Sequence, residues 1–304
     1  MEKEHAASLK VKMVSVEDRA SVARVCGIEQ HVSSTDQIEY LEACEAEQAV
    51  GYLALVWSAG GNAWLRGPKI MRHGSVSASK IARALLNQAD HLFELKNIKL
   101  AQVMLSPTQD HKASWYAECG YDTQIALELL TRPLVKDRPS APEPELSPAD
   151  ANCHSIGYAP QFHARFSQVL AASYVDSSDC LAMRRHSDPE MALADFRDVP
   201  DFDPTLWRLF GSNREDFGCL LLHHHPDEAS LEIAYLGFKP PFRRCGWGHR
   251  AMATVLSIAK RLDCQRVTVG VDIRNNPARR LYARWGFWCF SRQQVLIRTA
   301  SAEF

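Results

Sequence analysis

The sequence predicts an α/β protein of two tandem domains, each a mixed, mostly antiparallel sheet flanked by helices. Three observations support this prediction. Strand-like and helix-like segments follow the same order in both halves, one offset aligns the halves, and a proline-rich stretch separates them. The length of 304 residues is enough for two ordinary domains, each with its own core.

The first half opens with alternating apolar and polar side chains, the pattern of a half-buried strand. The segment from Ser58 to Asn62 contains two adjacent glycines and is typical of a hairpin turn. The expected strands lie at residues 9–14, 49–57, 63–66, 100–105 and 125–131, and the expected helices at residues 16–25, 79–95 and 112–119.

The second half repeats this order. Its amphipathic segment at residues 249–262 places Met252, Val255 and Leu256 at helical spacing, which predicts one buried face. The expected strands lie at residues 155–158, 231–238, 266–273 and 294–298, and the expected helices at residues 160–174, at residues 188–196, at residues 249–262 and from Asn275 onward.

An offset of 166 residues aligns the two halves without a gap, which argues for duplication. The stretch between them, residues 133–150, carries five prolines among charged side chains and predicts a stiff, polar connector. The expected domains are therefore residues 1–132 and 151–304. The aligned pairs are Tyr116 with Tyr282, Gly120 with Gly286, Tyr121 with Phe287 and Arg132 with Arg298.

The composition excludes several classes of protein. The 35 Lys and Arg residues balance 36 Asp and Glu residues, so no basic surface for nucleic acid or membrane is predicted. The nine cysteines are scattered without a C-x-x-C pair, so we expect neither a disulfide framework nor a metal site. No segment has the length and apolarity of a signal peptide or membrane span, and a cytoplasmic protein is expected.

The stretch from Arg243 to Gly248 reads R-x-x-G-x-G and lies between a strand that ends at Pro240-Pro241 and a helix. Glycines let the backbone approach a ligand, and the first N–H groups of a helix favour a phosphate. Arg243 and Arg244 add charge-assisted donors. The glycine spacing differs from that of a Rossmann turn or a P-loop. The motif predicts a pyrophosphate site.

A second motif begins at Asn275, which has the position of a helix N-cap with Pro277 in the first turn. Asn275 and Tyr282 are seven residues apart, about two helical turns, so they share a face. With these two motifs at this mutual distance, the sequence resembles the GNAT superfamily of acyl-CoA-dependent N-acetyltransferases. The matching stretches are Leu236 to Gly248, Asn275 to Tyr282, and Gly286 with Phe287.

The resemblance implies a site for acetyl-CoA and the residues that form it. The strand backbone would bind the pantetheine arm and thioester carbonyl, and the glycine turn would wrap the pyrophosphate. His249 either donates to a phosphate or simply begins the helix. The implied acetyl-CoA residues are Leu236, Gly237, Phe238, Arg243, Arg244, Cys245, Gly246, Trp247, Gly248, His249 and Asn275.

The resemblance also implies catalytic roles. Tyr282 matches the tyrosine that protonates the leaving thiolate, and Glu232 stands where some protein-acetylating relatives carry the base. A carboxylate, strand N–H groups and a phenol are the groups that direct attack of an amine on a thioester requires. Tyr282 could instead be a core tyrosine, and Glu232 a solvated residue near a hairpin.

The first half lacks the acetyl-CoA motif at the aligned positions. Ser77 and Lys80 stand at the first arginine and the first glycine of R-x-x-G-x-G, and Gln109 stands at the capping asparagine. We expect a degenerate domain that keeps the fold, with Tyr116 structural. In the alternative, Lys69 and Lys80 hold phosphates and this half also binds acyl-CoA.

The expected function is transfer of an acetyl group from acetyl-CoA to a primary amine of a small molecule, catalysed by the second half. Asp176 and Asp179 lie in the long segment that shapes the acceptor side in the resembled fold, and they would attract a cationic amine. Polar clusters of this kind are also common in surface loops.

The run from His223 to His225 predicts a solvated hairpin end and not a metal site, because neighbouring strand residues point to opposite faces. Two alternatives remain: a non-catalytic acyl-CoA sensor or scaffold, and an enzyme that acetylates a protein N-terminus or lysine. The oligomeric state stays open.

Overall fold

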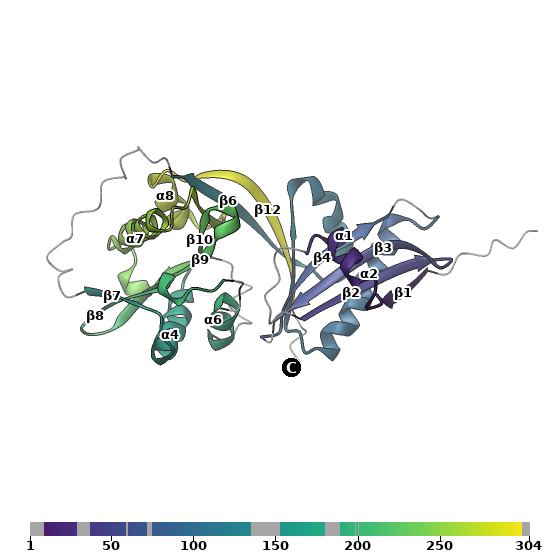
Figure 1. Ribbon diagram of the computed structural model, residues 1–304, viewed down its shortest axis with the longest axis horizontal. Helices are drawn as coiled ribbons and strands as arrows, with labels where there is room; N and C mark the ends of the chain where they lie inside the picture. The colour runs from purple at the N-terminus through teal and green to yellow at the C-terminus, as the bar shows by residue number, and fades with distance from the viewer. Residues whose placement is uncertain are drawn as a thin grey trace, which may run out of the picture. The chain divides into compact units, whose positions relative to one another are not determined.

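The computed structural model describes residues 9–28, 37–58, 60–71, 75–134, 153–179, 189–197, 199 and 201–299. The chain divides into two compact units (Figure 1), which we describe separately. Unit 1 comprises Met1–Ile125 and Gln294–Phe304, and unit 2 comprises Ala126–Gln293. These boundaries fall inside two strands, residues 123–133 and 288–299, and each strand is described with the sheet that it closes.

Unit 1 contains a mixed sheet with the strand order β1-β2-β3-β4-β5-β12. The β4–β5 pair is parallel, and the other neighbours are antiparallel. Helix α1 packs with Tyr40, Ala54 and Val56 on one face, whereas α2 packs in the larger core on the other. The elements are β1 Leu9–Met13, α1 Arg19–Cys26, β2 Gln37–Glu45, β3 Gln48–Trp57, β4 Asn62–Ile70, α2 Ala78–Leu95, β5 Leu100–Leu105, η1 Pro107–Lys112, α3 Ala113–Ala117 and β12 Trp288–Thr299.

Unit 2 contains a sheet with the same topology, in the order β7-β8-β9-β10-β11-β6. Here the β10–β11 pair is the parallel one, and its neighbours are antiparallel. The mixed, mostly antiparallel sheet flanked by helices is thus confirmed. The elements are β6 Thr123–Pro133, β7 Cys153–Gly157, η3 Pro160–Phe162, α4 His163–Tyr174, α6 Pro189–Arg197, η4 Pro204–Leu206, β8 Arg208–Ser212, β9 Asp216–His225, η5 Pro226–Glu228, β10 Ser230–Phe238, η6 Pro240–Phe242, α7 Trp247–Arg261, β11 Arg266–Asp272 and α8 Asn276–Arg284.

The faces of the unit 2 sheet carry different helices (Figure 1). Alternate residues of β9 explain why: Leu220 and Leu222 join the core under α7 and α8, whereas Leu221 joins the core under α4 and α6. This alternation is the two-residue period of a strand buried on both sides. The site described below lies where β10, α7 and α8 meet the end of α4.

Each unit takes its last strand from the other half of the chain. Strand β6 closes the unit 2 sheet, with Asp272 opposite Leu127 and Arg266 opposite Pro133. Strand β12 closes the unit 1 sheet, with Thr299 opposite Leu100. The compact units therefore divide at residues 125 and 293, and not at the predicted residues 132 and 151. Residues 135–150 of the predicted connector lie outside the described residues.

The predicted offset recurs in the element bounds. Strands β5 and β11 begin at Leu100 and Arg266, and helices α2 and α7 end at Leu95 and Arg261, each an interval of 166 residues. The two halves thus have the same fold in the same register, as a duplication predicts.

Strands β2 and β8 were not predicted. The sequence of β2 contains three glutamates, which weaken the apolar alternation that marks a strand. Each glutamate has a partner distant in sequence: Glu39 pairs with Arg19, Glu42 pairs with Lys12, and buried Glu45 accepts hydrogen bonds from Ser75. These contacts allow a charged strand to lie within the sheet.

Two features are absent from the described residues. None of the helices there is long and apolar enough to cross a membrane. In the same part of the chain, no group of three or more His, Cys, Asp and Glu side chains is arranged to hold a metal ion.

Candidate active site

The backbone of β10 is the first component of the site. Strands β10 and β11 pair from Ser230 with Arg266 as far as Ile233 with Val269, and there the ladder ends. Beyond a bulge after Ile233, β10 stays paired with β9 as far as Phe238. The edge of β10 that faced β11 is therefore available to an extended ligand over residues 236–238.

The second component is the turn that leads into α7. Gly246 is its N-cap, with φ +85°, and no side chain caps the helix. The first N–H groups of α7 are thus left for a ligand, with the positive end of the helix dipole behind them. Gly248 is needed for helix packing, because a Cβ at this position would lie only 3.0 Å from Cδ2 of Leu281. It lets α7 and α8 pack closely.

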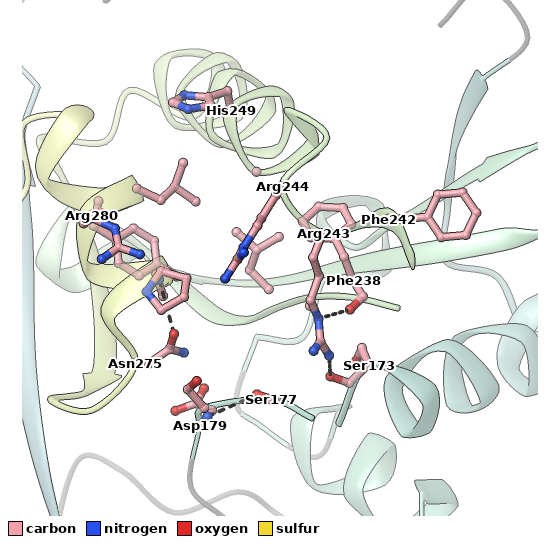
Figure 2. Close-up of a pocket in the computed structure, with 18 of the residues that line it drawn as sticks. Ser173, Ser177, Asp179, Phe238, Phe242, Arg243, Arg244, His249, Asn275 and Arg280 are labelled. Atoms are coloured by element: carbon pink, nitrogen blue, oxygen red, sulfur yellow. Dashed lines mark hydrogen bonds between the residues drawn. The ribbon is translucent and has the colours of Figure 1, made fainter. Parts of the chain in front are cut away.

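These elements border a pocket of about 570 Å³, a size typical of small-molecule sites. Figure 2 shows it from close by. It brings together nine of the eleven predicted acetyl-CoA residues with Tyr282, Asp176 and Asp179. The lining residues are Ser173, Asp176, Ser177, Ser178, Asp179, Tyr235, Leu236, Gly237, Phe238, Phe242, Arg243, Arg244, Gly246, Gly248, His249, Asn275, Pro277, Ala278, Arg280, Leu281, Tyr282 and Arg284.

The two remaining predicted residues, Cys245 and Trp247, are not among the lining residues. Trp247 is buried against Phe217, and the Arg250 guanidinium lies over its ring. Cys245 is exposed, and its thiol lies near the carbonyl oxygens of Pro241 and Arg243. Only their backbone is left for the predicted role.

The Arg243 guanidinium donates hydrogen bonds to backbone carbonyl groups. Its Nε donates to Phe238 O at 2.9 Å, and its Nη1 and Nη2 donate to Asp176 O at 3.0 Å and Val175 O at 2.6 Å. A further bond at 2.9 Å reaches Ser173 O near the end of α4, where the helix dipole favours a cation. Arg243 thus joins the glycine turn to the segment after α4, a positioning role that the sequence did not reveal.

Three other arginines in the pocket are exposed: Arg244, Arg280 and Arg284. None of these three side chains has a hydrogen-bond or ion-pair partner among the described residues. Figure 2 shows Arg244 and Arg280 directed into the pocket from the α7 and α8 side. Arg280 and Arg284 were not predicted from the sequence, although their spacing of four residues places them on one helix face.

His249 stands beside these arginines. The indole N–H of Trp285 donates to its Nδ1 at 2.9 Å. An imidazole that accepts at Nδ1 carries its proton on Nε2 when it is neutral. His249 is therefore held as a donor at Nε2, which suits the predicted phosphate contact.

Helix α8 presents the two predicted residues of the second motif. Asn275 is the N-cap, and its Oδ1 accepts from Ala278 N at 3.2 Å, which leaves its amide NH₂ for the pocket. Tyr282 is only 5% exposed, yet within the described chain its hydroxyl makes no hydrogen bond. Burial, with the charge of Asp179, raises the Tyr282 pKa above its usual value, so the phenol stays protonated.

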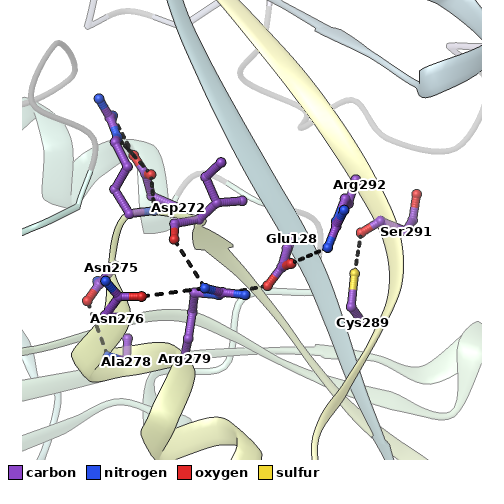
Figure 3. A network of polar contacts seen from close by, with 11 residues as sticks. Glu128, Asp272, Asn275, Asn276, Ala278, Arg279, Cys289, Ser291 and Arg292 are labelled. Atoms are coloured by element: carbon purple, nitrogen blue, oxygen red, sulfur yellow. Dashed lines mark hydrogen bonds and ion pairs between the residues drawn. The ribbon is translucent and has the colours of Figure 1, made fainter.

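The start of α8 is anchored to β6 through a buried carboxylate (Figure 3). Glu128 is 5% exposed and accepts from Arg279 Nε at 2.8 Å and from Arg292 Nη2 at 3.0 Å. Arg279 also donates to Ile273 O at 3.4 Å, beside the turn that carries Asn275. This network fixes the part of α8 from which Asn275 and Tyr282 reach the pocket.

The opposite end of the pocket is acidic. Asp176 and Asp179 both line it, and Figure 2 shows Asp179 and Ser177 across from Arg244 and Arg280. Ser177 Oγ accepts from the Asp179 backbone N–H at 3.1 Å, which orders this turn. The pocket therefore has a cationic end and an anionic end.

A second tyrosine, Tyr235, lines the pocket and packs against the core under α4 and α6. The Tyr235 hydroxyl lies 2.7 Å from Ser173 Oγ, which donates to Leu170 O at 2.7 Å. Since the serine proton is used, Tyr235 is the donor in their shared bond. Of the two pocket tyrosines, Tyr282 is the one whose hydroxyl has no acceptor among the described residues, so its proton is available for chemistry.

Glu232 lies outside the pocket lining. Its carboxylate pairs with His225 Nε2 at 2.9 Å, on the face where His223 contacts Phe196 O. Desolvation would raise the Glu232 pKa, but the His225 hydrogen bond and the charges of His223 and His225 outweigh it and lower that pKa. Its role as base stays a prediction, which requires a water between Glu232 and the acceptor.

In unit 1 the counterpart of Tyr282 occupies the corresponding place. The β4–β5 ladder also ends early, at Trp64 with Gln102, but there the buried Tyr116 hydroxyl donates to Gly67 O on β4. Helix α2 starts after Ser77 at the position of the glycine turn. The counterpart of Tyr282 in unit 1 thus makes a structural hydrogen bond.

Comparisons with known proteins agree with this geometry. Residues 179–287 match the model of the acetyltransferase (GNAT) family. Over 84 residues the chain is 29% identical to YycN of Bacillus subtilis (strain 168), whose name is uncharacterized N-acetyltransferase. The match covers 27% of this chain and 54% of that protein, so the chain spans about half the length of this curated relative.

Solved structures resemble the chain over nearly its whole length. A GCN5-related N-acetyltransferase from Sphaerobacter thermophilus has a TM-score of 0.61 at 14% identity, over 96% of this chain and 95% of that one. A tandem GNAT protein from the clavulanic acid biosynthesis pathway has a TM-score of 0.54 at 12% identity, over 98% and 100%. At these identities the likeness establishes the fold.

Proposed function

Because the C-terminal half carries a GNAT acetyltransferase domain and the chain has the fold of tandem GNAT proteins, we propose that this protein acetylates a small-molecule primary amine from acetyl-CoA. The proposed site is the pocket of unit 2, and the amine attacks the thioester directly. Unit 1 is proposed to be a degenerate copy without a site of its own.

The residues of the pocket would share the reaction as follows. Asp176 and Asp179 attract the ammonium form of the amine, and Glu232, kept ionised by its lowered pKa, accepts the proton through water. The unpaired β10 edge offers backbone groups to the thioester arm. Acetyl-CoA, when bound, supplies the acyl group and leaves as a thiol.

Tyr282 would provide the proton for that leaving thiol. A free thiol has a pKa near 8.5, and its thiolate takes a proton readily from a well-placed acid. The raised pKa of Tyr282 keeps the phenol protonated at neutral pH, and its hydroxyl has no competing acceptor within the described residues. The acetyl group passes from sulfur to nitrogen, and the proton passes from the phenol to sulfur.

The observation that carries the proposal is the charge arrangement of the pocket. Exposed Arg244, Arg280 and the start of α7 suit the phosphates of a nucleotide thioester, and Asp176 and Asp179 suit a cationic acceptor. A scaffold that only binds acyl-CoA would not require the acidic end, or a buried phenol without a hydrogen-bond partner among the described residues.

A panel of primary amines with acetyl-CoA tests the proposal, with released thiol as the readout. For an amine that turns over, Asp176→Asn with Asp179→Asn should raise KM for the amine at least about tenfold. KM for acetyl-CoA should stay within about twofold of wild type, because the carboxylates lie at the other end of the pocket. Equal effects on both constants, or none, would refute the assignment of these residues.

A separate outcome distinguishes the acceptor classes. Turnover with peptides but with no small amine would replace the small-molecule acceptor by a protein N-terminus or lysine. Binding of acetyl-CoA with no turnover on either panel would favour a sensor or scaffold.

A further inference from the structure

The pocket contains more positive charge than a pyrophosphate needs. The first N–H groups of α7 and the Nε2 of His249 already supply donors next to the glycine turn. Beyond them stand Arg244, Arg280 and Arg284, all exposed and all lining the pocket. This surplus requires its own explanation.

Other arginines of the same segment have structural roles, and their guanidinium groups are bound by protein acceptors. Arg243 donates to four carbonyl oxygens, Arg274 to the buried Asp272 carboxylate, and Arg279 to Glu128. By contrast, Arg280 and Arg284 have no such acceptor in the described part of the chain. Since no described residue neutralises their charge, we take it to be available to a ligand.

The positions of Arg280 and Arg284 define one surface. They are four residues apart on α8, so their side chains leave the same face of the helix about one turn apart. Gly248 lets α7 approach Leu281 of the same helix, which brings the glycine turn with Arg244 close to this face. Figure 2 shows Arg244 and Arg280 converging from the two elements.

We propose that Arg280 and Arg284, with Arg244, form a binding site for a phosphomonoester, which selects the 3′-phosphate of coenzyme A. The inference rests on the proposed function and names the part of the co-substrate that these residues recognise. A phosphomonoester carries a charge of about −1.5 to −2 at pH 7 and three acceptor oxygens. Guanidinium groups stay protonated and match phosphate oxygens in pairs, so two or three of them suit this group.

The test compares CoA with 3′-dephospho-CoA, which differ only in this phosphate. Calorimetric titration of the full-length wild-type protein should show CoA binding at least about tenfold more tightly, the effect of one charge-assisted contact. In Arg280→Gln/Arg284→Gln, the affinity for CoA should fall until the two ligands bind within about twofold, and that for 3′-dephospho-CoA should not change. Added salt should weaken CoA binding more in wild type than in the variant.

A matched control removes the same charge elsewhere. Arg214→Gln/Arg261→Gln changes two exposed arginines that do not line the pocket, and should keep the wild-type preference for CoA. Glutamine keeps a helix propensity close to that of arginine, and thermal unfolding checks that both variants are folded.

The outcomes separate this inference from the proposed function. Equal affinity of wild type for the two ligands, or a preference that survives in the Arg280/Arg284 variant, overturns the phosphomonoester site and leaves the acetyltransferase proposal intact. No binding of either ligand to wild type overturns both.

Discussion

Arg243 and Arg244 are neighbours in one motif and have opposite roles. Arg243 is in extended backbone, and its guanidinium is held by carbonyl groups of residues 173–176 and 238. Arg244 has φ +61°, a left-handed conformation, and its exposed side chain enters the pocket. A charge reversal at Arg243 would therefore damage the fold of the turn, so Arg244 is the better position at which to probe ligand binding.

Tyr282 and its counterpart Tyr116 allow a matched test of the proposed acid. In Tyr282→Phe, kcat should fall by about 10²–10⁴-fold, because the proton donor is lost, with little change in KM for acetyl-CoA. Since this hydroxyl makes no hydrogen bond within the described residues, the thermal midpoint should stay near that of wild type. Steady-state kinetics and thermal unfolding measure the two effects.

The control, Tyr116→Phe, should give the reverse result. It removes the hydroxyl that donates to Gly67 O, so stability should fall by about 1 kcal/mol while kcat stays unchanged. The sign of the Tyr282 pKa shift adds a pH test. A raised pKa keeps the phenol in its acid form, so this group should cause no loss of kcat as pH rises from 7 to about 10. Similar kinetic losses in both variants would refute the assignment.

At the scale of elements, α8 depends on a carboxylate from the first half of the chain. Glu128→Gln removes the charge that Arg279 and Arg292 share, and keeps the size of the side chain. We expect a loss of about 1–2 kcal/mol in the free energy of unfolding, moderated because both arginines reach solvent. Because Asn275 and Tyr282 lie on this helix, kcat/KM should fall as well.

Glu215→Gln is the control for that change. Glu215 pairs with Lys239 at 3.1 Å, but its side chain is 47% exposed, so its loss should cost less than about 0.5 kcal/mol. Urea unfolding of both variants makes the comparison. A Glu128 variant as stable and as active as the Glu215 variant would show that the network does not position α8.

The sequence predicted most elements and much of the site, for identifiable reasons. Apolar periodicity located the helices and the apolar strands, and the two spaced motifs led to the GNAT resemblance, which the family match confirms. Periodicity failed for β2, where two glutamates pair with cations and the third accepts hydrogen bonds from Ser75, all distant in sequence. Periodicity could not show which strand closes each sheet, because the apolar pattern of a strand does not specify the strand with which it pairs.

Side-chain direction was likewise hidden in the sequence. The R-x-x-G-x-G motif did not show that the Arg243 side chain binds carbonyl groups while the Arg244 side chain points into the pocket. Nor did it show that Gly248 serves the packing of α7 on α8. Glu128 lies 144 residues before Asp272, the last residue of the strand that it joins, so no local pattern linked it to the site.

At the scale of the whole molecule, the exchanged strands make the two halves of the chain depend on each other. Without β6, the β11 edge from Arg266 to Asp272 loses its antiparallel partner and exposes backbone polar groups. Without β12, the edge of β5 likewise loses its antiparallel partner and exposes backbone polar groups. Neither half of the chain contains all the strands of the sheet in its own unit.

This exchange predicts the behaviour of the chain when it is expressed as two polypeptides, residues 1–134 and 151–304. Co-expressed, they should copurify through an affinity tag on either one, because each supplies a closing strand to the unit that the other mainly builds. Residues 151–304 expressed alone should unfold at a clearly lower temperature or aggregate through the bare β11 edge. A matched fragment, residues 123–293, retains β6 and should recover part of that stability. If residues 151–304 alone unfold at the wild-type temperature, the closing strand is dispensable, and the dependence of the site on the first half is refuted.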